Sequence, residues 1–71
     1  MQDVFLRKNE DYIKLGQLLK KAGVVTSGVE AKILIEEGHI FVNGESETRR
    51  GRKLYRGDKV TFEEETFRVV Q

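Results

Sequence analysis

The segment RRGRK, from Arg49 to Lys53, is the densest group of side chains that could bind a ligand. Four of these five residues are cationic, and arginine outnumbers lysine three to one. Because guanidinium groups form forked hydrogen bonds to phosphate oxygens, this composition favours a partner that carries phosphate. Cations this dense also repel one another unless an anion lies near them. The alternative interpretation is a basic loop that is merely solvated.

The side chains of this segment are expected to be accessible. No periodic apolar residue precedes Leu54, so most of the cations should reach solvent and none should need burial. On this interpretation, reversing the charges of Arg49, Arg50 and Arg52 together would leave the fold intact. Tyr55 could stack on an unpaired base, although a core or strand-flanking position is the more common role of a lone tyrosine beside a leucine.

A second basic cluster lies earlier in the chain. Residues 14–23 carry a net charge of +3 and residues 49–56 carry +5, so the overall net charge of +1 conceals both clusters. The first cluster consists of Lys14, Lys20 and Lys21. The last two also complement the negative end of a helix dipole, which gives them a structural explanation. If the fold brings the clusters together, they form one patch for an anionic partner.

Residues that could support catalysis are few. His39 is the only histidine, and the sequence identifies no partner that would position it for proton transfer. Ser27 already has a role as a helix cap, and the carboxylates of Glu36–Glu37 and Glu63–Glu65 lack the spacing of a metal-binding loop. With no cysteine, the chain has neither disulfides nor thiolate ligands. We therefore expect no enzymatic activity, no metal and no cofactor.

Two short helices are expected before the basic segment. The first ends near Gly23, and its apolar residues recur with the spacing of one buried helical stripe: Leu15, Leu18, Leu19 and Ala22. The second begins with Ser27 as N-cap and Glu30 at the third helical position, the pattern of a capping box, and Gly38 can end it. Because only a few residues separate the helices, we expect them to pack as a pair.

The pattern changes to the period of a β-strand after His39. Asn43–Gly44 is a strong signal for a tight hairpin, because both residues tolerate positive φ. Residues 59–62 and 66–70 then alternate as a pair of strands, and Val4 suggests a weaker strand near the start. The expected fold class is therefore α+β, with two short packed helices against a small antiparallel sheet.

The size and hydropathy of the chain suggest one small domain over residues 1–71. A domain of this length buries only about 60% of its unfolded surface, so the core must be small. The apolar runs are too short for a membrane span, and the start of the chain lacks the pattern of a signal peptide. We expect a monomer in the cytoplasm.

The run SGVEAKILIEEGHIFVNG, from Ser27 to Gly44, resembles the RNA-binding domain first known from small-subunit ribosomal protein S-four, also called the alpha-L motif. A Leu-x-x-Leu-Leu helix precedes the run, and Gly-Asp-x-Val follows it at Gly57. The resemblance covers about residues 13–62. The short chain and its RRGRKL segment further resemble the stand-alone YaaA-like members of this family.

The resemblance implies two helices against a small antiparallel sheet and the recognition of folded RNA, usually ribosomal or transfer RNA. In the family, basic residues at the starts of both helices and near the Val-Asn-Gly hairpin face phosphate. Those positions correspond to Lys14, to Gly28 with Lys32, and to Asn43. Gly28 stands where the family commonly has arginine, and the glycine after Leu15 stands where it commonly has aspartate.

The sequence therefore predicts non-catalytic binding of structured RNA, with ribosomal RNA as the expected target, by a small ribosome-associated or ribosome-assembly factor. The alternative is a small protein-interaction adapter that uses its basic strip on an acidic partner. Duplex DNA is a poorer fit, because the second helix lacks base-reading side chains. The predicted RNA-binding residues are Lys14, Lys20, Lys21, Gly28, Lys32, Asn43, Arg49, Arg50, Arg52 and Lys53.

Overall fold

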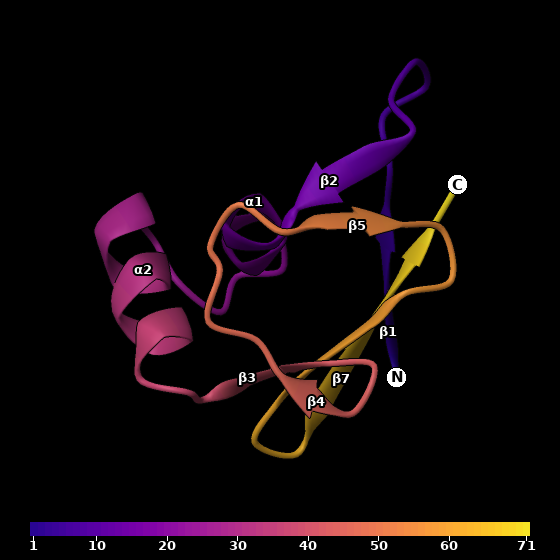
Figure 1. Cartoon of the computed structure of the whole chain (residues 1–71). Helices are drawn as coiled ribbons and strands as arrows, with labels where there is room; N and C mark the ends of the chain where they lie inside the picture. Colours follow the sequence, from indigo (N-terminus) through magenta and orange to yellow (C-terminus); the bar gives the residue numbers. More distant parts are fainter.

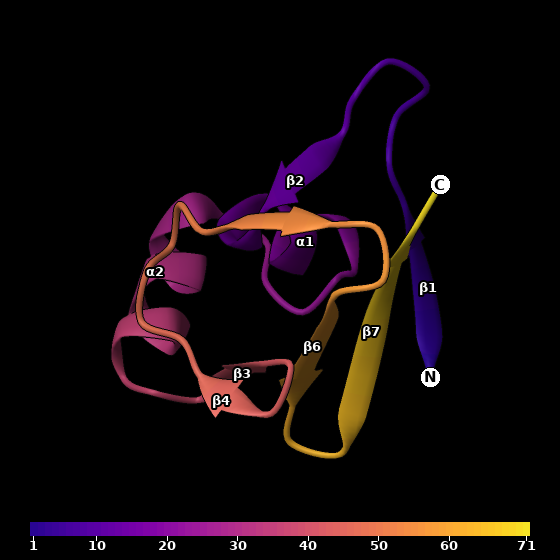
Figure 2. The same cartoon turned by 45° about the vertical axis from the view of Figure 1, so that its right-hand side comes forward.

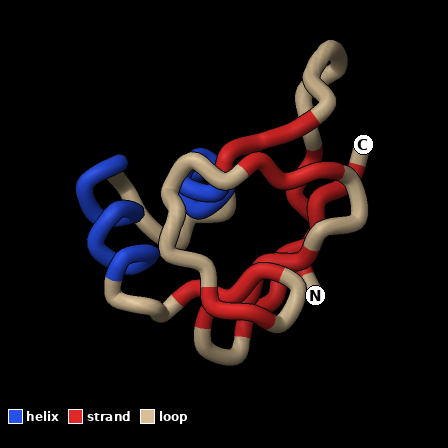
Figure 3. Tube along the Cα trace, in the orientation of Figure 1, coloured by secondary structure: helices blue, strands red, loops and turns tan.

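Two helices and seven strands make up the chain in a computed structural model that describes residues 1–71 (Figure 1). The tube in Figure 3 shows the helices on one side of the molecule and most of the strands on the other. In chain order the elements are β1 (Gln2–Phe5), β2 (Tyr12–Lys14), α1 (Leu15–Lys21), α2 (Gly28–Glu36), β3 (Ile40–Val42), β4 (Glu45–Ser46), β5 (Lys53–Tyr55), β6 (Lys59–Phe62) and β7 (Glu65–Val70).

The main sheet has five strands in the order β1-β7-β6-β3-β4. The pairs β7–β6, β6–β3 and β3–β4 are antiparallel, as the sequence predicts. The edge strand β1 differs, because it runs parallel to β7 with Gln2 opposite Phe67. Parallel neighbours need a long connection, and here that connection includes both helices and all the other strands. The two-helix, antiparallel-dominated architecture is thus confirmed, with one parallel pair added.

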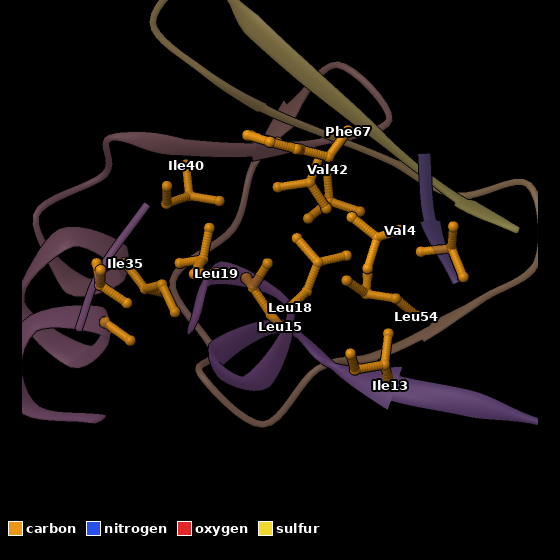
Figure 4. Close-up of a cluster of buried hydrophobic side chains, with 14 residues drawn as sticks. Val4, Ile13, Leu15, Leu18, Leu19, Ile35, Ile40, Val42, Leu54 and Phe67 are labelled. Carbon is orange, nitrogen blue, oxygen red and sulfur yellow. The ribbon is translucent and has the colours of Figure 1, made fainter. Parts of the chain in front are cut away.

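The core lies between the helices and the inner face of the sheet (Figure 4). Strand alternation explains the sheet's share of it: Ile40 and Val42 are buried whereas Phe41 between them is exposed. From α1, one stripe of apolar side chains fills the space beneath the sheet. Its fully buried members are Leu15, Leu18 and Leu19.

Both helices begin and end close to where the sequence predicts. Gly23 and Gly38 follow the two helices with φ of 81° and 83°, the left-handed conformation that glycine adopts without strain. The Ser27 hydroxyl accepts a hydrogen bond from the backbone N–H of Glu30 at 3.2 Å, which confirms the N-cap. The Glu30 carboxylate accepts from the backbone N–H of Thr26 at 2.8 Å and from its hydroxyl, and these bonds lower the pKa of Glu30.

A second, two-stranded sheet formed by β2 and β5 was not expected from the sequence. Lys14 lies at the start of the first helix, as expected, but it also ends β2, and Lys53, which was expected in a basic loop, begins β5. Each strand has only three residues, so alternation cannot be recognised within either one. The pair exists because Ile13 and Leu54, opposite each other in the register, both point into the core.

Neither helix has the length and apolar character needed to span a membrane.

A candidate RNA-binding surface at the start of the first helix

The β2–β5 ribbon brings together two lysines that are far apart in the sequence. Lys14 and Lys53 are register partners on antiparallel strands, so their side chains lie on the same face of the ribbon. Ile13 and Leu54 occupy the opposite face and are buried. The core therefore fixes which way the lysines point, and both are exposed.

Two tyrosines share this outward face. Tyr12 and Tyr55 are also register partners, and their ring centroids lie 5.9 Å apart with a tilt of 52°. The ammonium of Lys53 lies 4.9 Å from the centroid of the Tyr12 ring, a cation–π distance. We call the set Tyr12, Lys14, Lys53 and Tyr55 the ribbon face. It combines cations with aromatic rings and contains no carboxylate.

The arginine segment, residues 49–52, lies against the start of α1 beside the ribbon (Figure 2). The N–H of Gly16 donates to the carbonyl of Arg50 at 3.0 Å, and that of Leu15 donates to the carbonyl of Arg52 at 2.9 Å. A Cβ at Gly16 would lie only 2.9 Å from Cγ of Arg50. The glycine that stands where the family commonly has aspartate therefore makes room for Arg50.

A buried carboxylate organises this segment. The Glu47 side chain is only 7% exposed and forms ion pairs with two arginines. Arg49 donates from Nε to Oε2 at 3.0 Å and from Nη2 to Oε1 at 3.1 Å, while Arg52 donates from Nη1 to Oε1 at 2.8 Å. The backbone N–H of Arg49 adds a fourth bond at 3.1 Å. We call this arrangement the Glu47 clamp.

The hydrogen bonds of the clamp change the acidity of its carboxyl group. Chiefly because Arg49 donates to it, the pKa of Glu47 falls from 4.5 to about 2, even though burial alone would raise it. The same pair raises the pKa of Arg49. Glu47 is therefore ionised at neutral pH, and the chain itself supplies the anion that dense arginines require.

The clamp corrects two expectations from the sequence. Arg52 is half-buried, and neither it nor Arg49 is free of an internal partner. Reversing their charges would place three acidic groups together, one of them buried, so we now expect this change to destabilise the fold. Sequence reasoning missed Glu47 because it counted as one more charge in an acidic stretch. The available signal for an ion pair was the nearness of Glu47 to Arg49 and Arg52 in the sequence.

The two lysines of α1 lie at its C-terminal end. Lys20 and Lys21 are exposed in its last turn, as predicted. The Lys21 ammonium donates to the backbone carbonyl of Phe5, which ties α1 to β1. Both lysines border a hollow that also takes in Arg7 and Gln17. The same hollow is also lined by Glu10, so its charge is mixed.

The other predicted residues lie on other elements or in a turn. Gly28 and Lys32 lie on α2, and no hydrogen bond or ion pair connects them with the arginine segment. Asn43 has a structural role in the hairpin turn between β3 and β4. Its Nδ2 donates to Asp58 at 3.1 Å, and its Oδ1 accepts from the N–H of Lys59 at 2.9 Å, so one side chain holds two turns together.

The structure gathers no set of groups for metal binding, since no cluster of three or more histidine, aspartate or glutamate side chains could hold an ion. His39 is exposed, and Glu37 lies 3.5 Å from its Nε2. At the start of α1, cations lie beside aromatic rings, an arrangement suited to binding anions and aromatic rings.

Comparison with known proteins identifies the family. The model of the S4 domain family matches residues 6–70 of this chain. The chain belongs to the S4 domain family. The solution structure of YbcJ from Escherichia coli, described as revealing an alpha-L motif involved in RNA binding, superposes with a TM-score of 0.72 at 38% identity, covering 100% of this chain and 89% of YbcJ. The expected fold and family resemblance are thus confirmed.

Two relatives match over most of their length. RlbA from Bacillus subtilis, named as a probable ribosome maturation protein, is 51% identical over 53 residues, which are 75% of this chain and 75% of RlbA. YbcJ from Escherichia coli strain K12 is 41% identical over 59 residues, which are 83% of this chain and 84% of YbcJ.

Proposed function

We propose that this S4-domain protein binds structured RNA without catalysing a reaction, and that its target is ribosomal RNA in a subunit or a precursor. The observation that carries the proposal is the grouping of Lys14, Arg50 and Lys53 around the start of α1. None of the three has a carboxylate within ion-pair distance. The description of YbcJ as RNA-binding and the name of RlbA as a ribosome maturation protein support it.

The Glu47 clamp supports phosphate binding even though it consumes some arginine donors. A guanidinium carries five N–H groups, and Arg49 uses only Nε and one amino group on Glu47. Its side chain remains 73% exposed, so the other donors face solvent. An arginine already held in one orientation loses less conformational freedom when it meets phosphate. The clamp therefore prepares Arg49 for a phosphate contact.

Lys20, Lys21 and Lys32 have a secondary place in this proposal. They are exposed cations outside the central group, and they would add phosphate contacts if the RNA extends along α1 or toward α2. Transfer RNA offers the same phosphate chemistry as ribosomal RNA, so the cations alone do not distinguish the two. The relation to RlbA favours the ribosomal target.

The target is tested by co-sedimentation of the tagged protein with ribosomal subunits and their precursors, with and without nuclease. We expect the protein to move with one subunit or its precursor and to be released by nuclease. Association that survives nuclease and moderate salt would instead support the protein-interaction adapter. Association with transfer RNA alone would keep RNA binding and refute the ribosomal target.

The cationic surface is tested by the salt dependence of binding to the co-sedimenting RNA. If roughly four to six phosphates are contacted, the log–log slope of affinity against salt should be on the order of −3 to −5. Lys53→Glu should weaken binding strongly. Lys59→Glu is its matched control, since Lys59 is also an exposed lysine at the first position of a strand, β6. Equal effects of the two would refute a localised site.

A further inference from the structure

We infer that the ribbon face is a stacking site for one unpaired RNA base, with the ring of Tyr55 as its platform and lysines at its edges. The inference rests on the proposed RNA binding and specifies what the RNA must present. It follows from three features of the ribbon: the forced exposure of Tyr55, the bracing of the tyrosine pair, and the two register-paired lysines.

The exposure of Tyr55 is imposed by the fold. Successive side chains of a strand point to opposite faces, so the complete burial of Leu54 places Tyr55 outside. Tyr55 is 50% exposed, and its ring takes no part in the core. The ring of Tyr55 therefore offers an accessible π-face to solvent.

The platform is held in place from both sides. The backbone N–H of Tyr55 donates to the Asp58 carboxylate at 2.8 Å, which fixes the end of β5. Tyr12 is half-buried and supports the Tyr55 ring at a centroid distance of 5.9 Å. Because the ammonium of Lys53 already lies over the Tyr12 ring, the free ring of the pair is that of Tyr55. A base can stack there without prior rearrangement.

The charges around the rings favour a nucleotide over other flat ligands. Lys14 and Lys53 lie side by side on the ribbon, where they can meet the phosphates that flank a stacked base. Glu10 and Asp11 line the hollow beside Tyr12, so the strand should approach from β5 and the arginine segment. Bases inside a duplex have no free face, whereas bulged or looped bases do. The ribbon face therefore selects an unpaired nucleotide, such as a bulged or looped base beside an RNA duplex.

The test uses two RNA hairpins that differ by one bulged 2-aminopurine, a fluorescent base whose emission falls on stacking. We expect the parent protein to bind the bulged hairpin more tightly and to quench its fluorescence. Base–aromatic stacking is worth about 1–3 kcal/mol, so Tyr55→Val should weaken binding of the bulged hairpin by about 5- to 150-fold. Binding of the fully paired hairpin should stay unchanged.

Two variants separate stacking from folding. Tyr55→Val removes the ring but keeps a residue that favours strands, and Tyr55→Phe keeps the ring without the hydroxyl, so it should bind and quench like the parent. If the parent binds both hairpins equally without quenching, or Tyr55→Val weakens both equally, the stacking site is refuted while RNA binding stands. If the parent binds neither these hairpins nor ribosomal RNA, the proposed function itself fails.

Discussion

The arginine segment and the ribbon face lie next to each other at the start of α1, yet they hold their cations in different ways. In the arginine segment, Arg49 and Arg52 share a buried carboxylate. On the ribbon face, Lys53 lies over an aromatic ring and Lys14 has no acidic partner. In one region a buried carboxylate holds two of the cations, and in the other the cations have no acidic partner.

This difference shows that a run of cations in a sequence can combine two separate functions. The clamped arginines stabilise the fold and orient the few donors that remain free. The lysines of the ribbon face contribute little to stability, because exposed charges are well solvated. Substitutions in the two regions should therefore differ: those in the clamp should change unfolding as well as RNA binding, and those on the ribbon should change RNA binding alone.

The largest expected effect is the loss of both partners of Glu47. The double variant Arg49→Ala, Arg52→Ala leaves a buried carboxylate without a cation, and breaking such a pair from one side costs about 3–5 kcal/mol. We expect the free energy of unfolding, measured by urea denaturation, to fall by this amount. Small domains have little stability to spare, so part of the population should be unfolded without denaturant.

Two controls accompany this measurement. Arg50→Ala removes an arginine of the same segment that has no carboxylate partner, and it should change stability by less than about 0.5 kcal/mol. Adding Glu47→Gln to the double variant removes the unpaired charge and should restore part of the loss. Equal unfolding midpoints for the double variant and Arg50→Ala would mean that the clamp does not stabilise the fold.

The second prediction concerns acid. Folding lowers the pKa of Glu47 from 4.5 to about 2, so the stabilisation is complete above about pH 5 and is lost as pH falls toward 2. A shift of this size corresponds to roughly 3 kcal/mol. Glu47→Gln should lack this part of the acid sensitivity, so the stability difference between parent and variant should shrink at low pH. A constant difference from pH 7 to pH 3 would contradict the clamp.

On the ribbon face the effect should be on binding alone. The variant Lys14→Gln, Lys53→Gln removes two exposed charges, so its unfolding free energy should stay within about 0.5 kcal/mol of the parent. If each lysine contacts one phosphate, the log–log salt slope should lose about 1.4 to 1.8 of its magnitude. Salt titrations with one RNA decide the outcome. An unchanged slope would mean that the arginine segment, and not these two lysines, contacts the phosphates.

The smallest change tests the contact between α1 and Arg50. Gly16→Ala adds a Cβ that would meet Cγ of Arg50 at 2.9 Å, so Arg50 must shift near its backbone. Alanine also favours the helix by up to about 1 kcal/mol, and stability should change by less than this amount. RNA affinity should fall severalfold because a free cation is displaced. Unchanged affinity would remove Arg50 from the site.

Much of the fold could be predicted because its signals are local. The capping serine of α2, the glycine after each helix and the Asn43–Gly44 hairpin depend on neighbours within a few residues. Strands β6 and β7 are four and six residues long, enough for their alternation to be recognised. The parallel partner of β1 could not be predicted, because a pairing between Gln2 and Phe67 leaves no trace in local pattern.

The candidate site was less accessible to sequence reasoning, because it depends on register. The basic residues could be identified, but the alignment of Lys14 with Lys53 follows from the pairing of two three-residue strands. Glu47 looks like any surface glutamate until its burial is known. Tyr12 attracted no attention, since its role depends on facing Tyr55 across the ribbon.

The parallel pairing of β1 with β7 also constrains how the chain reaches its native state. A nascent chain emerges N-terminus first, so β1 is synthesised long before β7, its only strand partner. Contacts between residues so far apart in the sequence form slowly, because a large loop must close before the contacts stabilise the chain. We expect the helices and the β3–β6 pair to collapse first. The edge strand should dock in a late, separate step, which pulse-labelling of its backbone amides by hydrogen exchange would detect as delayed protection.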